Sequence, residues 1–257
     1  MSEIISENSF YYYALISWIG LSIITFIFLI VFKPKTYGRH IRKDKFSINN
    51  RLGWFLMELP TVILIPYFVF TGSSDYNLVT LSFICLYMIH YLNRVFVFPL
   101  RIKTKGKRIP LLVVVSAIVF NVCNTYFIGY YFGNLSPIYD ISWFYSPYFI
   151  IGFIVFLIGA YINNHSDTIL INLRKGADNE YKVPFGGLFK YVSCPNHLGE
   201  IIEWIGFAIL SWSLPTFAFA LWTIANLLPR AIQHHDWYHN HFEDYPKDRK
   251  AVFPYLL

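Results

Sequence analysis

Glu58 is a carboxylate inside an apolar run, Gly53–Phe70, where it stands in the sequence WFLMELP. An ionisable group at membrane depth costs about 3 kcal/mol on insertion scales, so it indicates a functional site by default. An unpaired carboxyl in such a run takes up a proton and can then donate a hydrogen bond in a binding site. The alternative is an interfacial glutamate near a helix end that water satisfies. The residue pattern leaves both interpretations open.

Tyr87, Tyr91 and Arg94 form a second polar group, in the apolar run Leu78–Leu100. Their i, i+4, i+7 spacing places them on one face of a helix. A tyrosine at this depth usually anchors an interface or fills a core. Arg94 favours a functional interpretation, because its guanidinium must face protein or water rather than lipid.

Polar residues also recur at helical spacing in the C-terminal part of the chain, between Asn163 and Tyr245. Three rows share this spacing: Asn163 and Asp167; Asn196, Glu200 and Glu203; and Arg230, His234 and Tyr238. A helix dipole explains an acid in a first turn, as at Glu200, but not three polar residues on one face of a membrane helix. These rows supply carboxylates and amides for ribose or amide groups, and arginines for phosphates.

The histidine-rich run HHDWYHNH, His234–His241, includes an i, i+4 pair at His235 and His239. Metal centres need several such ligands, and the remaining histidines are scattered singly, so we predict no metal. Neither a GxGxxG nor a GxxxxGK[ST] motif is present, so a bound nucleotide would not use a Rossmann or P-loop fold. FGGLF, residues 185–189, is an ordinary turn signal.

The elements that position these residues are long apolar segments. The chain is 56% hydrophobic and only 14% charged, against about 25% charged in soluble domains, which predicts a multi-span membrane protein. The three cysteines are far apart and predict neither a disulfide framework nor a zinc site. The basic residues behind the net charge of +6 lie in the segments between the apolar spans rather than in one patch, so we expect no nucleic-acid partner. The first apolar run is too long for a cleavable signal peptide.

We predict an all-α fold, an integral membrane bundle of seven transmembrane helices in a single domain, residues 1–257. The spans are expected at about Tyr11–Phe32, Gly53–Phe70, Leu78–Leu100, Ile109–Phe132, Trp143–Ile162, Leu198–Trp212 and from Thr216, with the last helix running to His241. Between the fifth and sixth spans we expect a polar segment, Asn163–His197. Alternate loops are basic, which places the N-terminus outside, in the lumen or periplasm, and the C-terminus in the cytoplasm.

The residues match one known family. GGLFKYVSCPNHLGEIIEWIGFAILSWSLP, with HSD upstream and FEDYPKDRKAVFPYLL at the end, resembles the steroid 5α-reductases (3-oxo-5α-steroid 4-dehydrogenases). The likeness extends through KPKTYGRH, WFLMELP and HYLNRVFVF and covers nearly the whole chain. The C-terminal region is shared with enoyl-CoA reductases, polyprenol reductases and isoprenylcysteine methyltransferases. The Glu58 and Tyr91 motifs favour the steroid branch, and Met57, where a vertebrate member has Gln, leaves the substrate preference open.

The resemblance implies a role for each matching residue. Glu58 and Tyr91 would bind the 3-keto oxygen of a Δ4-3-oxosteroid, and Trp54 and Trp204 would line the steroid pocket, built from spans 2, 3 and 6. NADPH would lie in the cytoplasmic half, mainly within residues 163–257 with loop 33–51. Its predicted ligands are Tyr37, Asn163, Asp167, Arg174, Tyr181, Asn196, Glu200, Arg230, His234 and Tyr238.

The implied reaction adds hydride to the β-carbon of the enone, and donors at the carbonyl oxygen stabilise the resulting enolate. Three alternatives stay open: a reductase of another lipid enone, of enoyl-CoA or polyprenol type; a membrane methyltransferase; and a non-enzymatic lipid carrier. The expected partners are a steroid and the lipid bilayer, in the endoplasmic reticulum or a bacterial inner membrane. The sequence fixes no oligomeric state and is compatible with a monomer.

Overall fold

The computed structural model describes residues 2–34, 46–104, 106–173 and 181–257, with the side chains of residues 2–7 undescribed. The fold is mostly helical and divides into two compact units. Unit 1 comprises Met1–Ser17 and Pro34–Ser146, and unit 2 comprises Trp18–Lys33 and Pro147–Leu257. The first helix, α1 (Ser2–Phe32), therefore contributes one half to each unit.

Unit 1 is built around helices α2 and α5, which pack along each other. After the first half of α1, the elements of unit 1 in chain order are β1 (Ser47–Asn49), α2 (Asn50–Thr71), α3 (Leu78–Leu92), the π-helical turn η2 (Asn93–Val97), α4 (Phe98–Arg101), β2 (Arg108–Pro110), α5 (Leu111–Tyr130), the π-helical turn η3 (Tyr131–Leu135) and the 3₁₀ turn η4 (Ile141–Tyr145). Strands β1 and β2 pair antiparallel, with Ile48 opposite Ile109. This pairing joins the segments that lead into α2 and α5.

Local sequence explains where the helices of unit 1 begin. The side chains of Asn49 and Asn77 accept hydrogen bonds from the first free N–H groups of α2 and α3, as helix caps do. At the other end of α2, Gly72 and Gly133 bring the backbones together: a Cβ on either would lie within about 2 Å of a carbonyl oxygen, that of Gly133 or of Phe68. The close approach keeps α2 and α5 in a fixed register.

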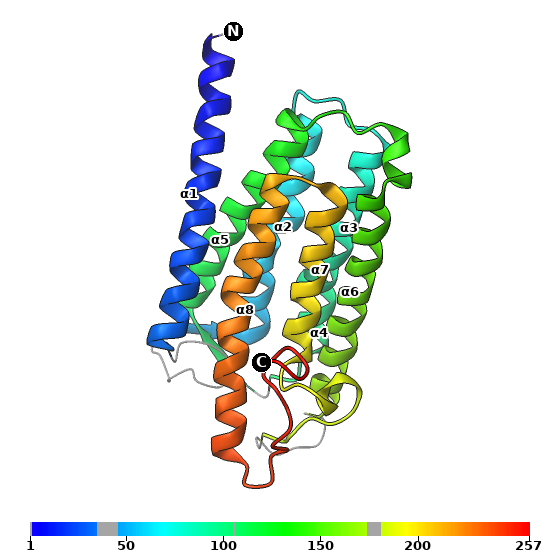
Figure 1. Ribbon diagram of the computed structural model, residues 1–257. Helices are drawn as coiled ribbons and strands as arrows, with labels where there is room; N and C mark the ends of the chain where they lie inside the picture. Colours follow the sequence, from blue (N-terminus) through cyan, green and yellow to red (C-terminus); the bar gives the residue numbers. More distant parts are fainter. Residues whose placement is uncertain (1, 35–45, 105, 174–180) are drawn as a thin grey trace. The chain divides into compact units, whose positions relative to one another are not determined.

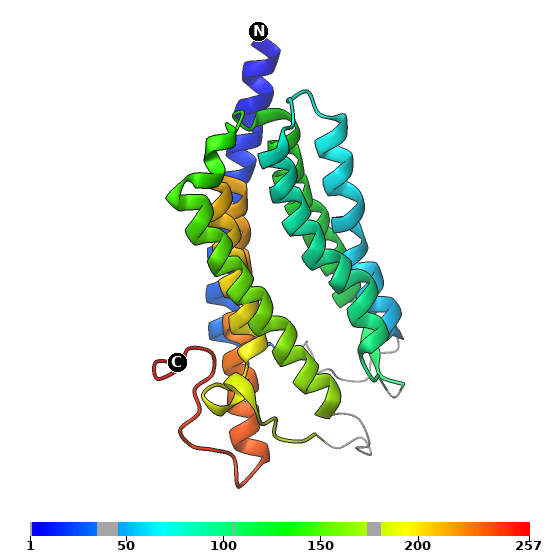
Figure 2. The same ribbon diagram turned by 90° about the vertical axis from the view of Figure 1, so that its right-hand side faces the viewer.

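Unit 2 consists of α6 (Pro147–Leu173), the 3₁₀ turn η5 (Gly187–Lys190), α7 (Pro195–Ser211) and α8 (Leu214–His241), with the second half of α1. Helices α6 and α7 run antiparallel and side by side (Figures 1 and 2). Two glycines of each helix, seven residues apart, make this possible: Gly152 and Gly159, Gly199 and Gly206. A Cβ on Gly159 would lie 2.2 Å from the backbone nitrogen of Glu203. The two backbones are therefore in direct contact.

The C-terminal segment folds back onto the start of α7. Val192 and Lys250 form a parallel bridge, and the backbone N–H of Ser193 donates to Lys250 O at 2.8 Å. Ala251 and Val252 are buried against α7 and α8 in one apolar cluster with Leu198 and Ile201. This contact fixes the segment that precedes α7.

The structure confirms the helical fold and corrects one boundary. Five described helices are long and apolar enough to cross a bilayer: Asn8–Phe32, Asn50–Thr71, Leu78–Arg101, Leu111–Leu135 and Pro147–Leu173. The fifth continues to Leu173, beyond the expected end of the span at Ile162, so the first part of the expected polar segment is helical, with Asn163, Ser166 and Asp167 buried. The last helix runs to His241 as predicted. Helices α7 and α8 are not among the five, and seven spans stay a prediction.

Candidate active site

Glu58 lies within α2 and faces α5. The Asn121 amide nitrogen, Nδ2, donates to Glu58 Oε2 at 3.2 Å and to the carbonyl oxygen of Met57 at 2.7 Å. Thr61 Oγ1 donates to the backbone carbonyl of Glu58 at 2.6 Å. The Glu58 side chain is half-buried and has a protein partner.

Tyr91 and Tyr87 meet on the buried face of α3, as their spacing predicts. Tyr91 is 5% exposed and Tyr87 is fully buried, with ring centroids 4.5 Å apart. The side chains of Asn124 and Thr125, on α5, lie around the Tyr87 hydroxyl, and the Glu58 carboxyl is within electrostatic range of it. Helices α2, α3 and α5 thus bring a carboxyl, two phenols and amides into one polar cluster in unit 1.

The Arg94 guanidinium contacts protein side chains, as predicted. Arg94 itself lies in the π-helical turn that follows Tyr91. The chain becomes π-helical at Asn93, which adds a residue to the turn and shifts the phase after Tyr91. The Arg94 guanidinium lies 5.0 Å from the Trp54 ring centroid and 4.5 Å from that of Phe98. Cation–π contacts of this kind stabilise a guanidinium in partly apolar surroundings. The half-buried Trp54 ring thus packs against the charged Arg94 guanidinium.

Asn163 connects α6 to α7 in unit 2. It is 2% exposed, and its Nδ2 atom donates to the backbone carbonyl of Asn196 at 3.0 Å and to Glu200 Oε2 at 3.4 Å. A Cβ on Gly199 would lie 2.3 Å from the Asn163 nitrogen, so only glycine lets α7 come this close. The structure thereby brings together three of the predicted cofactor ligands.

The row on α8 is also directed at neighbouring side chains. The His234 ring lies 5.8 Å from that of His197, on α7. Tyr238 is 3% exposed and its ring stacks on Tyr245 at 5.1 Å, with the planes within 9°. Arg230 is half-buried on the same helix. Tyr181 contacts α8 at Trp237, the residue before Tyr238, with the two ring centroids 5.1 Å apart.

A hydroxyl–imidazole network lies beside this row. Ser193 Oγ is 2.6 Å from His235 Nδ1 and 2.7 Å from the Tyr245 hydroxyl. Burial lowers the pKa of His235, and the neighbouring His239 and Lys250 lower this pKa further, while Asp236 opposes them. The network joins α8, the start of α7 and the C-terminal segment.

Arg249 lies in the same region and is 3% exposed. Its guanidinium carbon is 4.8 Å from the Phe185 ring centroid and 5.2 Å from that of Tyr245. Its Nε and Nη1 atoms have no hydrogen-bond partner within the described ranges. A buried guanidinium with two nitrogens that lack an acceptor is costly, so this geometry fits an anionic ligand.

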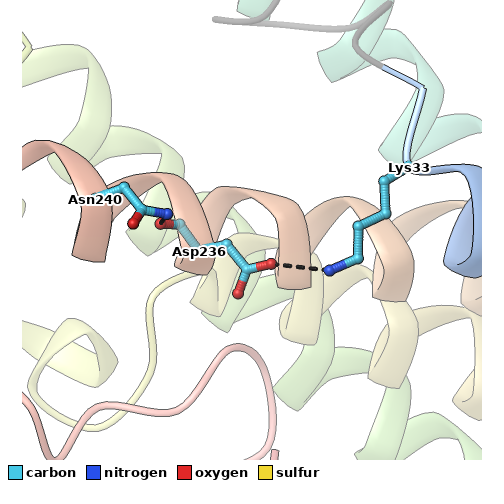
Figure 3. A network of polar contacts seen from close by, with 3 residues as sticks. All are labelled: Lys33, Asp236 and Asn240. Carbon is cyan, nitrogen blue, oxygen red and sulfur yellow. Dashed lines mark hydrogen bonds and ion pairs between the residues drawn. The ribbon is translucent and has the colours of Figure 1, made fainter.

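The start of loop 33–51 is tied to α8. Lys33 Nζ lies 3.1 Å from Asp236 Oδ2, and Asn240 Nδ2 donates to the Asp236 carbonyl at 2.8 Å (Figure 3). Both charged side chains are about half exposed, so the pair contributes roughly 0–1 kcal/mol. The contact is positional: it places the beginning of the loop beside the His234–Tyr238 row.

The remaining predicted residues have mixed outcomes. Asp167 and Glu203 are buried in unit 2, and Trp204 is 1% exposed with its ring 4.5 Å from that of Phe219. Tyr37 and Arg174 lie outside the described residues. In the described part of the chain no three His, Cys, Asp or Glu side chains gather as metal ligands would. Sequence reasoning missed Asn121, Asn124 and Thr125, whose i, i+3, i+4 spacing on α5 was a usable signal, and it missed Ser193 and Arg249.

The long apolar helices and the two buried polar clusters define a multi-pass membrane protein with polar sites inside its helical units. Residues 107–257 match the family model described as 3-oxo-5-alpha-steroid 4-dehydrogenase. A rat protein named 3-oxo-5-alpha-steroid 4-dehydrogenase 1 is 44% identical over 224 residues, 86% of each chain. Its human counterpart is 40% identical over 225 residues, again 86% of each chain. Steroid 5-alpha-reductase DET2 of Gossypium hirsutum is 37% identical over 256 residues, 98% of this chain and 99% of its own.

The chain belongs to the 3-oxo-5α-steroid 4-dehydrogenase family. The resemblance drawn from its motifs is thereby confirmed. The relatives' names denote oxidoreductases that act on a CH–CH bond of a steroid.

Proposed function

We propose that this protein is an NADPH-dependent reductase that saturates the Δ4 double bond of a 3-oxo-Δ4-steroid and forms the 5α product. The proposed reaction class is supported by the similarity to family members over nearly the full chain. The polar cluster around Glu58 and Tyr91 supports the chemistry, because it offers donors for a ketone oxygen within an apolar unit. The proposal assigns ketone binding to unit 1 and cofactor binding to unit 2.

The role of unit 1 is to hold and polarise the ketone. When bound, NADPH supplies the hydride that adds to the β-carbon of the enone. Negative charge then develops on the 3-keto oxygen, and the protonated Glu58 carboxyl and the Tyr91 hydroxyl donate hydrogen bonds to it. Loss of one such donor typically costs about 10²–10³ in rate. Water or a further acid protonates the α-carbon, and Trp54 and Trp204 contribute apolar surface for the steroid.

The residues of unit 2 fit a dinucleotide. Asn163, Asn196 and Glu200 offer amide and carboxylate groups for ribose or amide recognition, and Asp167 lies one turn further along α6. The buried Arg249 guanidinium has two nitrogens, Nε and Nη1, without an acceptor in the described residues and therefore suits a phosphate. The proposed ligands also include Arg230, His234 and Tyr238 on α8, and Tyr181, which packs against α8. Tyr37 and Arg174 remain proposed ligands. The single-domain assignment belongs to the same proposal, as does a steroid pocket formed by spans 2, 3 and 6.

The proposal includes the membrane topology: seven spans, with the N-terminus in the lumen or periplasm and the C-terminus in the cytoplasm. The endoplasmic reticulum and a bacterial inner membrane both suit this arrangement. NADPH is a cytosolic cofactor, which agrees with placing the basic loops and the α8 row on the cytoplasmic side.

The test is turnover by the purified protein in detergent. Given testosterone or progesterone, it should consume NADPH faster than NADH and yield the saturated 5α-steroid by mass and stereochemical analysis. Glu58→Gln and Tyr91→Phe should fold normally and lose about 10²–10³ in kcat. Asp75→Asn, which changes an exposed carboxylate in the α2–α3 loop, should leave turnover unchanged.

Other outcomes would replace the proposal. A response only to an acyl-CoA or a polyprenol-derived enone would move the substrate class. Binding of S-adenosylmethionine with indifference to NADPH would indicate a methyltransferase. The absence of any thermal stabilisation by NADPH, together with no turnover, would favour the lipid carrier.

A further inference from the structure

We propose that Tyr245 is a positioning residue for the cofactor, which holds Arg249 and Tyr238 in place without contacting the cofactor itself. The inference rests on the proposed function, in which both of these residues bind NADPH. It adds a residue of the C-terminal segment to those that contact the cofactor directly, and it gives the hydroxyl–imidazole network of Ser193 and His235 a role in cofactor binding.

Tyr245 is the point at which two proposed cofactor ligands meet. Its ring is stacked on that of Tyr238, with the centroids 5.1 Å apart and the planes within 9° of each other. The guanidinium carbon of Arg249 lies 5.2 Å from the same ring centroid. Only 3% of the Tyr245 surface is exposed, so this residue acts on a ligand through its neighbours rather than by direct contact.

The contact with Arg249 stabilises a charge and leaves its N–H groups available. The guanidinium carbon lies over two aromatic rings, that of Tyr245 and that of Phe185, 4.8 Å from the centroid of the latter. An aromatic ring attracts a guanidinium but does not accept its N–H groups as a carboxylate would. The Nε and Nη1 atoms of Arg249 have no acceptor within the described residues. The two rings therefore hold the cation in place while these N–H groups stay available for a phosphate.

The ring of Tyr245 is itself fixed by its hydroxyl group. The hydroxyl oxygen lies 2.7 Å from Ser193 Oγ, which in turn lies 2.6 Å from Nδ1 of His235, on α8. The backbone N–H of Ser193 donates to Lys250 O at 2.8 Å. A buried tyrosine usually finds a partner for its hydroxyl, and here that partner ties the ring to the start of α7 and to α8. The two cofactor ligands thus pack on a ring that keeps one orientation.

The kinetic test uses two substitutions of Tyr245. Tyr245→Leu removes the ring, and we expect it to raise KM for NADPH about tenfold, the worth of a desolvated cation–π contact. Tyr245→Phe keeps the ring but releases it from Ser193, and should raise this KM about threefold, part of the worth of one hydrogen bond. Neither should change KM for the steroid, or kcat at saturating NADPH, by more than about twofold, since only cofactor binding is weakened.

Combined substitutions test whether Tyr245 acts through the named partners. In an Arg249→Gln background Tyr245→Leu should raise KM for NADPH less than about threefold, because much of its effect passes through the guanidinium. Ser193→Ala should match Tyr245→Phe, and the double variant should be no worse than either alone. Tyr255→Leu, at an exposed tyrosine of the same segment, is the matched control and should leave this KM unchanged. An equal effect of Tyr245→Leu in both backgrounds would overturn the proposal.

Thermal unfolding in detergent tests the proposal without turnover. A fixed concentration of NADPH should raise the unfolding midpoint of the Tyr245 variants less than that of the unsubstituted protein and of Tyr255→Leu. If Tyr245→Leu does not fold, Tyr245→Phe decides. A lower midpoint without cofactor, but an undiminished rise with NADPH, would show that Tyr245 only supports the fold and would overturn the proposal. Absence of steroid turnover, together with the expected loss of stabilisation by NADPH, would instead overturn the proposed function and retain the role of Tyr245.

Discussion

At the scale of single residues, Arg249 makes the strongest demand for a ligand, because its buried guanidinium has two nitrogens without an acceptor in the described residues. Arg249→Gln should raise KM for NADPH about tenfold or more, the worth of a charged hydrogen bond. Without cofactor the variant should be at least as stable, since it removes a buried charge that has two nitrogens without an acceptor in the described residues. Thermal unfolding with and without NADPH measures both effects.

Lys190→Gln provides the matched control for Arg249. Lys190 also lies over an aromatic ring, 5.5 Å from the Tyr191 centroid, but it is exposed. It should keep the full stabilisation by NADPH. If Arg249→Gln were stabilised by NADPH as much as the unsubstituted protein, the anion-binding role of Arg249 would be wrong.

His235 should make the stability of the folded protein depend on pH. Its pKa in the folded state is lowered, first by burial and then by His239 and Lys250, while Asp236 acts in the opposite direction. Both states hold a neutral imidazole well above pH 6.5. As the pH falls through about 6.5, the unfolded chain binds the proton first, so stability is lost below that value. The thermal midpoint should therefore fall between pH 7.5 and 5.5.

His235→Gln should remove part of this loss, since glutamine does not titrate and can still accept from Ser193. His241→Gln, at an exposed position of the same helix, should retain the full dependence. The comparison uses midpoints of unfolding in detergent across the same pH series. Identical slopes for His235→Gln and the unsubstituted protein would exclude His235 as the group responsible.

The sequence was sufficient for those site residues whose spacing has a period. Tyr87 and Tyr91 come together on one face of α3 as their spacing predicts, whereas the contact of Asn163 with Asn196 and Glu200 joins two helices and was not predicted by spacing. Asn121 was missed although its i, i+3, i+4 spacing with Asn124 and Thr125 was a usable signal. Arg249 was missed because its burial depends on the C-terminal segment folding back to α7, a long-range contact that no local pattern encodes.

At the scale of elements, the α6–α7 contact depends on glycine. Alanine in a helix is ordinarily about 1 kcal/mol better than glycine. At Gly159, however, the added Cβ would lie 2.2 Å from Glu203 N and 2.6 Å from Gly199 O, both backbone atoms that cannot move aside. Gly159→Ala should therefore destabilise the protein by roughly 1–3 kcal/mol, the usual cost of overpacking.

Gly20→Ala is the control for Gly159→Ala, because nothing lies within 4 Å of the position its Cβ would take on α1. It should be neutral or stabilising. Unfolding in detergent followed by tryptophan fluorescence reports both variants. Equal stability of the two would mean that α6 and α7 do not approach as closely as described.

The helices themselves were predictable from hydropathy, but their interruptions were not. The π-helical turn at Asn93–Val97 and the β1–β2 pair arise from tertiary packing in unit 1, and each involves too few residues to leave a pattern. The end of α6 was misplaced for a related reason. Asn163 and Asp167 resemble the polar end of a span, but both are buried, Asn163 against α7, and the helix continues to Leu173.

At the scale of the whole molecule, the open question is whether α7 and α8 cross the bilayer. We propose that α7 does, and the contacts of unit 2 support this proposal. Gly199 contacts Asn163, Gly206 contacts Phe156, and beyond the end of α7 the Trp212 ring lies 4.3 Å from that of Tyr148. Residues 148–163 of α6 extend about 22 Å at 1.5 Å per residue. Helix α7 returns along this whole length, most of the roughly 30 Å hydrocarbon thickness.

A topology of seven spans thus predicts that the α7–α8 turn lies on the outer side. Single cysteines, in a background with Cys85, Cys123 and Cys194 replaced by serine, can test this with a membrane-impermeant maleimide. Leu214→Cys, at the exposed start of α8, should react in sealed membranes, as should Asp75→Cys in the α2–α3 loop. Lys182→Cys and Glu243→Cys should react only after permeabilisation. If Leu214→Cys instead behaved like Glu243→Cys, α7 and α8 would form a re-entrant pair, and the cytoplasmic placement of the α8 row would rest on five spans rather than seven.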